Sequence, residues 1–176
     1  MPSSFLFGTG ADDDLRVGDR RDVVDVAYAG GGHDVVRLGH GDDILYADRA
    51  DQVALTVFEG RGGGDLHVGH HVEATLYLGL DDREDTVWVG SAHEYQGSRD
   101  AVWEVRQFGA EDRFDFSFAP ADAIVEGFLG RGDDLGLLID MGTHDDGTDA
   151  GTLTIWIDGG AALDPYAILD DVLFQT

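Results

Sequence analysis

The sequence has no cysteine and no lysine among its 176 residues. Without cysteine, the protein can form neither a disulfide nor a metal site built on thiolates. The 11 basic residues are therefore all arginine, and they stand against 36 acidic residues, which gives a formal net charge of −25. Because such a chain offers no basic patch to neutralise phosphates, we expect no binding to nucleic acid.

Long apolar segments are missing as well. No stretch of 18 residues is apolar, so we expect no transmembrane segment. Residues 1–7 contain neither a positively charged region nor a long apolar run, and no cleavable signal peptide is expected there. Apolar residues (43%) and aromatic residues (10%) are nevertheless too frequent for a disordered acidic tail. The chain should fold, as one domain or as a repeat array with a cap.

Aspartate dominates what is present, outnumbering glutamate 29 to 7. Its short side chain suits turns and metal-binding loops, whereas a merely solvated acidic surface would normally use both acids. So much negative charge should destabilise a compact state by self-repulsion unless cations offset it. Adaptation to high salt is a second explanation for the acidity, and the sequence does not separate the two.

The clearest pattern is a pair of consecutive nine-residue units, AGGGHDVVR at residues 29–37 and LGHGDDILY at residues 38–46. In each unit a glycine-rich half ends in aspartate, and residues with strand propensity follow. Glycine at the second and fourth places allows positive φ and a tight turn. Asp34 and Asp43 stand at the sixth place, where the chain enters a strand. Carboxylate and carbonyl oxygens, several to a site, are the ligands that Ca²⁺ takes.

These units resemble the G-G-x-G-x-D-x-U-x nonapeptide of RTX (hemolysin-type) proteins, whose arrays form a parallel β-roll that binds Ca²⁺. Ala29 and Leu38 depart from the glycine expected at the first place. A pair of ordinary Gly/Asp turns between strands is the competing interpretation. The repeat is favoured because glycine, aspartate and the apolar residues keep one nine-residue phase together. Degenerate units precede the pair, and the phase drifts after Tyr46.

About eight short β segments, separated by turn signals, therefore occupy the first half of the chain. We expect an all-β fold: an RTX-like parallel β-roll or short β-solenoid over residues 1–90, followed by an antiparallel β cap over residues 91–176, packed as one structural unit. The second half resembles the cap that follows RTX arrays, in which the C-terminus also acts as an uncleaved secretion signal. The segments that carry this resemblance are Asp112-Arg113-Phe114, Asp134-Leu135, Gly151-Thr152 and residues 171–174. Strands are expected at 103–108, 114–118, 135–140 and 152–157, and a helical turn at 165–170.

The resemblance also implies where calcium would bind. Successive turns would lie on alternate edges of the roll, with Ca²⁺ between a turn and the one two units later. The turn at 30–34 would then lie beside 48–51, and the turn at 39–43 beside 60–65. Each peripheral aspartate could equally be a turn former that bonds its own backbone. The candidate ligands are Asp12, Asp14, Asp22, Gly30, Gly32, Asp34, Gly39, Gly41, Asp43, Asp48, Asp51, Gly62, Gly64 and Asp65.

Several histidines and one polar loop are further candidates for a metal site. His33 and His40 occupy variable places of the repeat, and the neighbours His70 and His71 would face opposite ways on a strand. We therefore expect solvated histidines rather than a transition-metal site. The loop at 140–149 lacks the EF-hand ligand order. It could hold another Ca²⁺, but we expect a flexible hairpin loop.

The resemblance implies a non-enzymatic, secreted, calcium-binding protein with a structural, assembly or adhesion role in a surface layer, matrix or virion coat. A protein partner or self-assembly is expected. No nucleophile elbow, zincin helix or P-loop is present. A carbohydrate-binding or carbohydrate-modifying module, which stacks sugars on Tyr46, Tyr77, Trp88 and Trp103, is a competing hypothesis. A degenerate solenoid that binds no calcium and a small secreted enzyme are two more.

Overall fold

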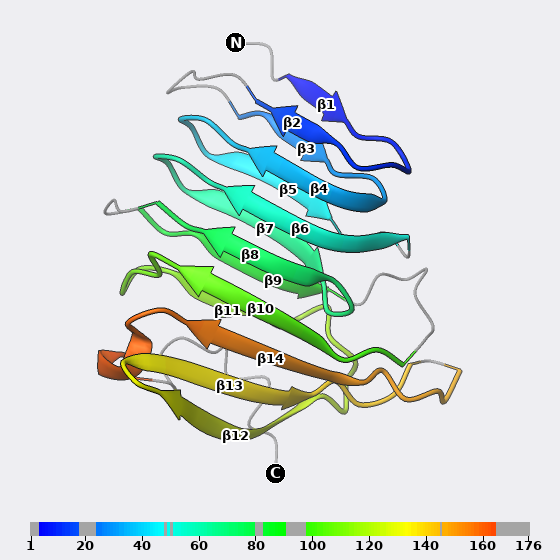
Figure 1. Cartoon of the computed structure of the whole chain (residues 1–176), viewed down its shortest axis with the longest axis vertical. Helices are drawn as coiled ribbons and strands as arrows, with labels where there is room; N and C mark the ends of the chain where they lie inside the picture. Colours follow the sequence, from blue (N-terminus) through cyan, green and yellow to red (C-terminus); the bar gives the residue numbers. More distant parts are fainter. Residues whose placement is uncertain are drawn as a thin grey trace.

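The computed structural model describes residues 4–17, 24–47, 49, 51–79, 83–90, 98–144 and 146–164 (Figure 1). Within these residues the chain is built from fourteen strands and one short 3₁₀ helix, η1, at Gly160–Ala162. The helical turn expected at 165–170 and the last segment lie outside the described residues. The strands are β1 Phe5–Phe7, β2 Asp14–Arg16, β3 Val26–Tyr28, β4 Gly32–Arg37, β5 Asp43–Ala47, β6 Gln52–Phe58, β7 Gly64–Gly69, β8 Glu73–Tyr77, β9 Thr86–Gly90, β10 Ala101–Arg106, β11 Arg113–Asp115, β12 Ile124–Arg131, β13 Asp134–Asp140 and β14 Thr152–Ile157.

The strands form two facing sheets, and the chain alternates between them. The six-stranded sheet has the order β1-β3-β5-β7-β9-β11, and the eight-stranded sheet has the order β12-β13-β14-β10-β8-β6-β4-β2. Neighbouring strands from β1 to β9 all pair in parallel. The region from about residue 5 to 90 is therefore a parallel β-solenoid of about four turns, as the sequence predicts.

Coil length follows the repeat where the repeat is regular. Val26 pairs with Ile44, and Asp25 bonds to Asp43 across 18 residues, which equals two nine-residue units. Elsewhere a coil takes 21 residues, as between Asp13 and Asp34. The extra residues enter in the turns, so the strands stay aligned while the turns differ from coil to coil.

The core lies between the two sheets and is built by alternation along each strand. In β5, Asp43, Leu45 and Ala47 face inward and are buried, while Ile44 and Tyr46 face outward. A single coil cannot enclose such residues, so stacking supplies the core. The fully buried residues on successive strands are Leu45, Leu66 and Val87 in one sheet and Val36, Val57 and Leu76 in the other.

The C-terminal region continues the stack before it reverses. β10 pairs in parallel with β8, β11 in parallel with β9, and β14 in parallel with β10. β13 then pairs antiparallel with β14, and β12 antiparallel with β13, which confirms antiparallel strands near the C-terminus. Trp103 on β10 is fully buried, and its indole N–H donates to the Val72 carbonyl at 2.8 Å. It is a core residue and offers no face to a sugar.

Candidate metal-binding turns

The turn at residues 30–34 lies in a stack of turns along one edge of the solenoid. The backbone N–H of Gly31 donates to the Thr9 carbonyl at 2.7 Å, and that of Gly32 donates to the Asp51 carbonyl at 3.0 Å. Gly30 has a φ of 94°, and a Cβ there would collide with the Thr9 carbonyl. The structure thus places this turn beside Asp51. Asp48 and Asp22 lie outside the described residues.

The turn at residues 39–43 lies on the other edge. It stacks on the turn at 60–64, where the N–H of Arg61 donates to the Gly39 carbonyl at 3.3 Å and that of Gly63 donates to Asp42 at 3.4 Å. A Cβ on Gly62 would collide with the Gly41 carbonyl, so the two turns meet backbone to backbone. The two turns that the repeat pattern pairs on this edge are therefore neighbours.

Asp34 is buried where the first of these turns enters β4. One carboxylate oxygen, Oδ1, accepts the backbone N–H of Asp13 at 2.9 Å. The other, Oδ2, has no hydrogen-bond partner among the described residues. Burial raises the pKa of Asp34, while the hydrogen bond from the Asp13 N–H opposes that shift. Gln52 holds its amide nitrogen in this turn by donating to the carbonyls of Gly32 at 3.1 Å and Ala54 at 2.8 Å.

Asp43 occupies the corresponding place where the second turn enters β5. It is fully buried, and its Oδ1 accepts the backbone N–H of Asp25 at 3.0 Å. Within the described part of the chain its Oδ2 has no hydrogen-bond partner. Burial is the main cause that raises the pKa of Asp43. The hydrogen bond from the Asp25 N–H opposes that shift, and the charges of Asp25 and Asp42 add to it.

The Asp25–Asp43 bond belongs to a ladder that follows the six-stranded sheet. At the start of strands in this sheet, the side chain of an aspartate accepts the backbone N–H of the residue at the equivalent position in the preceding coil. Gly64 interrupts the row of carboxylates, and the buried side chain of Glu59 lies against it. Sequence reasoning missed Asp25, Asp85 and Asp112, although each directly precedes a strand. The further bonds of the ladder run from Ser4 to Asp25 at 2.8 Å, from Gly64 to Asp85 at 2.7 Å and from Asp85 to Asp112 at 3.0 Å.

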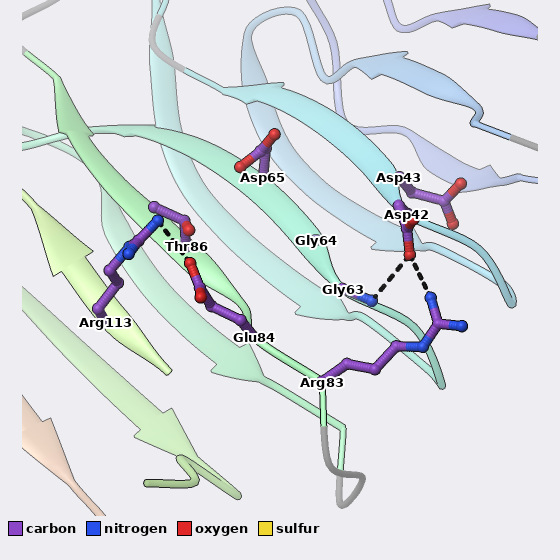
Figure 2. A pocket seen from close by; sticks show the side chains of 9 residues that line it. All are labelled: Asp42, Asp43, Gly63, Gly64, Asp65, Arg83, Glu84, Thr86 and Arg113. Carbon is purple, nitrogen blue, oxygen red and sulfur yellow. Dashed lines mark hydrogen bonds and ion pairs between the residues drawn. The ribbon is translucent and has the colours of Figure 1, made fainter. Parts of the chain in front are cut away.

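A pocket of about 430 Å³ opens on this edge of the solenoid (Figure 2). Figure 2 shows two arginines reaching acidic side chains here: Arg83 donates to Asp42 at 2.5 Å, and Arg113 pairs with Glu84 at 2.5 Å. The protein's own guanidinium groups therefore neutralise two of the carboxylates at this edge. The pocket is lined by Asp42, Asp43, Gly63, Gly64, Asp65, Arg83, Glu84, Thr86 and Arg113.

The exposed candidate aspartates have other partners. In the described ranges, no group of three or more acidic or histidine side chains lies close enough to hold a metal ion. Any ion in these turns would need carbonyl oxygens for most of its ligands. Asp14 pairs with Arg37. The remaining contacts are Asp12 with the N–H of His33 at 3.0 Å, Asp51 with Arg49 at 3.0 Å, and Asp65 with the indole N–H of Trp88 at 3.2 Å.

A second acidic pocket, of about 360 Å³, lies between the C-terminal strands and is outside the repeat pattern. Asp100 accepts the N–H of Thr152 at 3.0 Å, and Asp122 accepts that of Thr143 at 3.0 Å. Hydrogen bonds from these two threonines lower the pKa of each aspartate. The partners are 52 and 21 residues apart, so the sequence pointed only to the loop at 140–149 and not to Asp100 or Asp122. Its lining also includes Glu126, Asp140 and Asp149.

The expectation of solvated histidines is wrong for His70 and His71. Both are fully buried, with ring centroids 5.7 Å apart, and the His144 ring lies 5.6 Å from His70. The pair stands in the turn after β7, so strand alternation does not apply to it. Burial lowers the pKa of His71 to about 4 and also lowers that of His70.

A column of stacked rings runs along the outer face of the six-stranded sheet. Centroids are 5.0 Å apart for Phe7–Tyr28 and Tyr28–Tyr46, 4.7 Å for Tyr46–His67 and 5.4 Å for His67–Trp88, with interplanar angles of 17° or less. The rings therefore cover one another's faces and present their edges to solvent. Tyr77 stacks on Phe58 on the other sheet.

The chain matches none of the protein families with which it was compared, and none of the curated proteins. No helix among the residues described above is long and apolar enough to cross a membrane.

Proposed function

We propose that this protein is a secreted, non-enzymatic β-roll that folds around Ca²⁺ and serves a structural or assembly role. The observation that carries this proposal is the state of Asp34 and Asp43. Each is buried at the end of a glycine-rich turn, and each has one carboxylate oxygen without a hydrogen-bond partner in the described structure. An ionised carboxylate in such a place is costly unless a cation or donor compensates it.

Calcium suits these turns because it takes six to eight oxygen ligands and accepts backbone carbonyls among them. Asp34 would supply a carboxylate oxygen on one edge and Asp43 on the other. The nonapeptide resemblance at residues 29–46 supports the same choice of metal. Most of the remaining ligands would be carbonyls of the stacked glycine turns, including Gly30 and Gly32 on one edge and Gly39 and Gly41 on the other.

The proposed role follows from coupling between folding and ion binding. A ligand that binds the folded chain and not the unfolded chain stabilises the folded state by mass action. Where free Ca²⁺ is low, repulsion in a chain of net charge −25 would oppose folding; where it is high, binding would favour the compact roll. A protein that folds after export would then be available for assembly in a surface layer, matrix or coat.

The deciding experiment is thermal unfolding followed by circular dichroism, in about 5 mM Ca²⁺ and in EGTA, with Mg²⁺ and NaCl as controls. That concentration exceeds the roughly 10⁻⁴–10⁻³ M affinities of extracellular calcium modules. We expect a large rise in melting temperature with Ca²⁺ alone, reduced by combining Asp34→Asn with Asp43→Asn and unchanged by Asp133→Asn in an exposed turn. Equal melting in Ca²⁺ and EGTA, with stabilisation by NaCl, would contradict the proposal and indicate a salt-adapted solenoid.

Binding to a polysaccharide is less well supported. Sugars stack on the faces of aromatic rings, and in the outer column these faces are already covered by neighbouring rings. Of the four aromatic residues that could stack on a sugar, Trp103 is buried in the core. Tyr46 and Trp88 stand in the column, and Tyr77 packs against Phe58.

A further inference from the structure

The two sheets end in short edge strands at the N-terminal end of the stack. β1 pairs with β3 and β2 pairs with β4, and neither has a second strand partner in the described structure (Figure 1). The opposite end is built differently, because β12 there is antiparallel to its neighbour and eight residues long. Open strand edges pair readily with further strands. The two ends do not match each other, but the N-terminal ends of two copies are identical.

β1 offers an apolar edge. Its outward residues, Phe5 and Phe7, are 61% and 65% exposed, the highest values among the large apolar side chains described. The Ser4 carbonyl accepts the N–H of Val26, and the Gly8 N–H donates to Tyr28, so even-numbered residues bond toward β3. By alternation, the backbone groups of Phe5 and Phe7 point away from the sheet.

β2 offers a charged edge with the same geometry. The Asp13 carbonyl accepts the N–H of Val35, and the Val17 N–H donates to the Arg37 carbonyl, so odd-numbered residues bond toward β4. The backbone groups of Asp14 and Arg16 therefore point away from the sheet. Leu15 between them is buried in the core.

We propose that two copies of this chain join head to head about a two-fold axis, with β1 antiparallel to β1 and β2 antiparallel to β2 of the second copy. A register centred on Leu6 sets Phe5 opposite Phe7 of the second copy. A register centred on Leu15 sets Asp14 opposite Arg16 of the second copy. Both registers bring together the residues whose backbone groups point outward, so both edges form hydrogen-bonded pairs.

Charge selects this end for self-association. A net charge of −25 opposes association of two chains, but residues 1–11, which include β1, carry no charged side chain, and the turn that follows adds Asp12 and Asp13. β2 carries Asp14 and Arg16, and antiparallel pairing of two copies sets each aspartate opposite the arginine of the other copy. A second copy of the chain would be the partner in the assembly role proposed above, and this dimer does not depend on calcium binding.

The test is sedimentation velocity of the untagged full chain, in Ca²⁺ and in EGTA, from about 1 to 100 μM. We expect a concentration-dependent dimer. With Asp14→Arg each copy of β2 carries two arginines, and with Arg16→Asp it carries two aspartates. Like charges directly opposite destabilise a strand pair. The dissociation constant of the dimer should therefore rise at least about tenfold for each variant alone. An equimolar mixture of the two variants should form a one-to-one heterodimer, because arginines then face aspartates.

Phe7→Pro tests the β1 edge independently of charge. It removes the outward backbone N–H of residue 7, and proline is tolerated at an edge strand. Its circular dichroism spectrum should remain that of the wild type while dimerisation is lost. A wild-type chain that stays monomeric at about 100 μM would overturn the proposal, as would a dimer unaffected by all three variants or a variant mixture that does not associate. Stability that is insensitive to Ca²⁺ would contradict the proposed function alone and leave this dimer standing.

Discussion

The Oδ1 atom of Asp43 accepts the backbone N–H of Asp25 at 3.0 Å, and the two residues occupy the same place in successive coils. A side chain at the start of one strand thus satisfies the backbone of the coil before it. Because the same contact recurs at Asp85 and Asp112, the turns are tied together by carboxylates as well as by strand pairing.

Replacing Asp43 separates its acceptor role from its charge. Asp43→Ala leaves the Asp25 N–H without this partner, and we expect a loss of about 1–3 kcal/mol in the free energy of unfolding. Asp43→Asn keeps an acceptor and removes a buried charge, so in EGTA it should be more stable than Asp43→Ala and at least as stable as the wild type. Urea unfolding at pH 7 in EGTA measures both. Equal losses in the two variants would contradict the ladder role.

Acidification should weaken the fold through the buried histidines. The pKa of His71 is lowered to about 4 from 6.5, and that of His70 is also lowered. As pH falls from 6.5 toward 4, the unfolded chain takes up protons that the folded chain refuses, so stability is lost in this window. Urea midpoints measured from neutral pH down toward the lowered pKa should fall less for His71→Phe than for the wild type. An identical pH dependence in the two proteins would contradict this assignment.

The buried aspartates act in the opposite direction. Their pKa values are raised above 3.8, so the folded chain holds these protons more strongly than the unfolded chain does. Their contribution to stability is present at low pH and is lost as pH rises through the folded pKa. In EGTA, the combined Asp34→Asn and Asp43→Asn variant should therefore gain stability over the wild type at neutral pH, and the gain should shrink as the solution is acidified. A gain that is independent of pH would argue against ionised carboxylates at these places.

The backbone contact between turns predicts a sharp difference between two glycines. A Cβ at Gly62 would collide with the Gly41 carbonyl, whereas a Cβ at Gly10 would have its nearest described neighbour at 3.8 Å. Gly62→Ala should lower the free energy of unfolding by about 1–3 kcal/mol, and Gly10→Ala should stay within about 0.5 kcal/mol of the wild type. Denaturant unfolding measures both, and similar effects of the two substitutions would mean that the turns are not in contact.

The ring column should contribute to stability. Tyr46 stacks on Tyr28 and His67, and each such pair is worth about 0.5–1.5 kcal/mol beyond burial. Tyr46→Ala should therefore cost about 1–3 kcal/mol, while Tyr46→Phe keeps the ring and should retain most of the stability. Denaturant unfolding compares the two, and equal losses would show that ring stacking does not matter here.

Local pattern was enough for much of the fold. The nine-residue phase of Gly30, Asp34 and their equivalents placed the turns and the strands that follow, because side-chain alternation and turn chemistry are properties of a short segment. The strand at 152–157 has the bounds that its alternation indicates. β12 was missed, since Gly127 and Gly130 interrupt its pattern and most of its side chains are exposed.

The sequence by itself determined the class of the fold, the sixth-place aspartates at the strand starts and the excess of negative charge. Only the tertiary structure decided which of these aspartates are buried, that Arg83 and Arg113 reach the acidic edge, and that His70 and His71 leave solvent. The physical reason is coil length, which is 18 residues at Asp25–Asp43 and 21 at Asp13–Asp34. Insertions in the turns decide which residues of neighbouring coils come into contact, and the nine-residue repeat alone does not predict where those insertions occur.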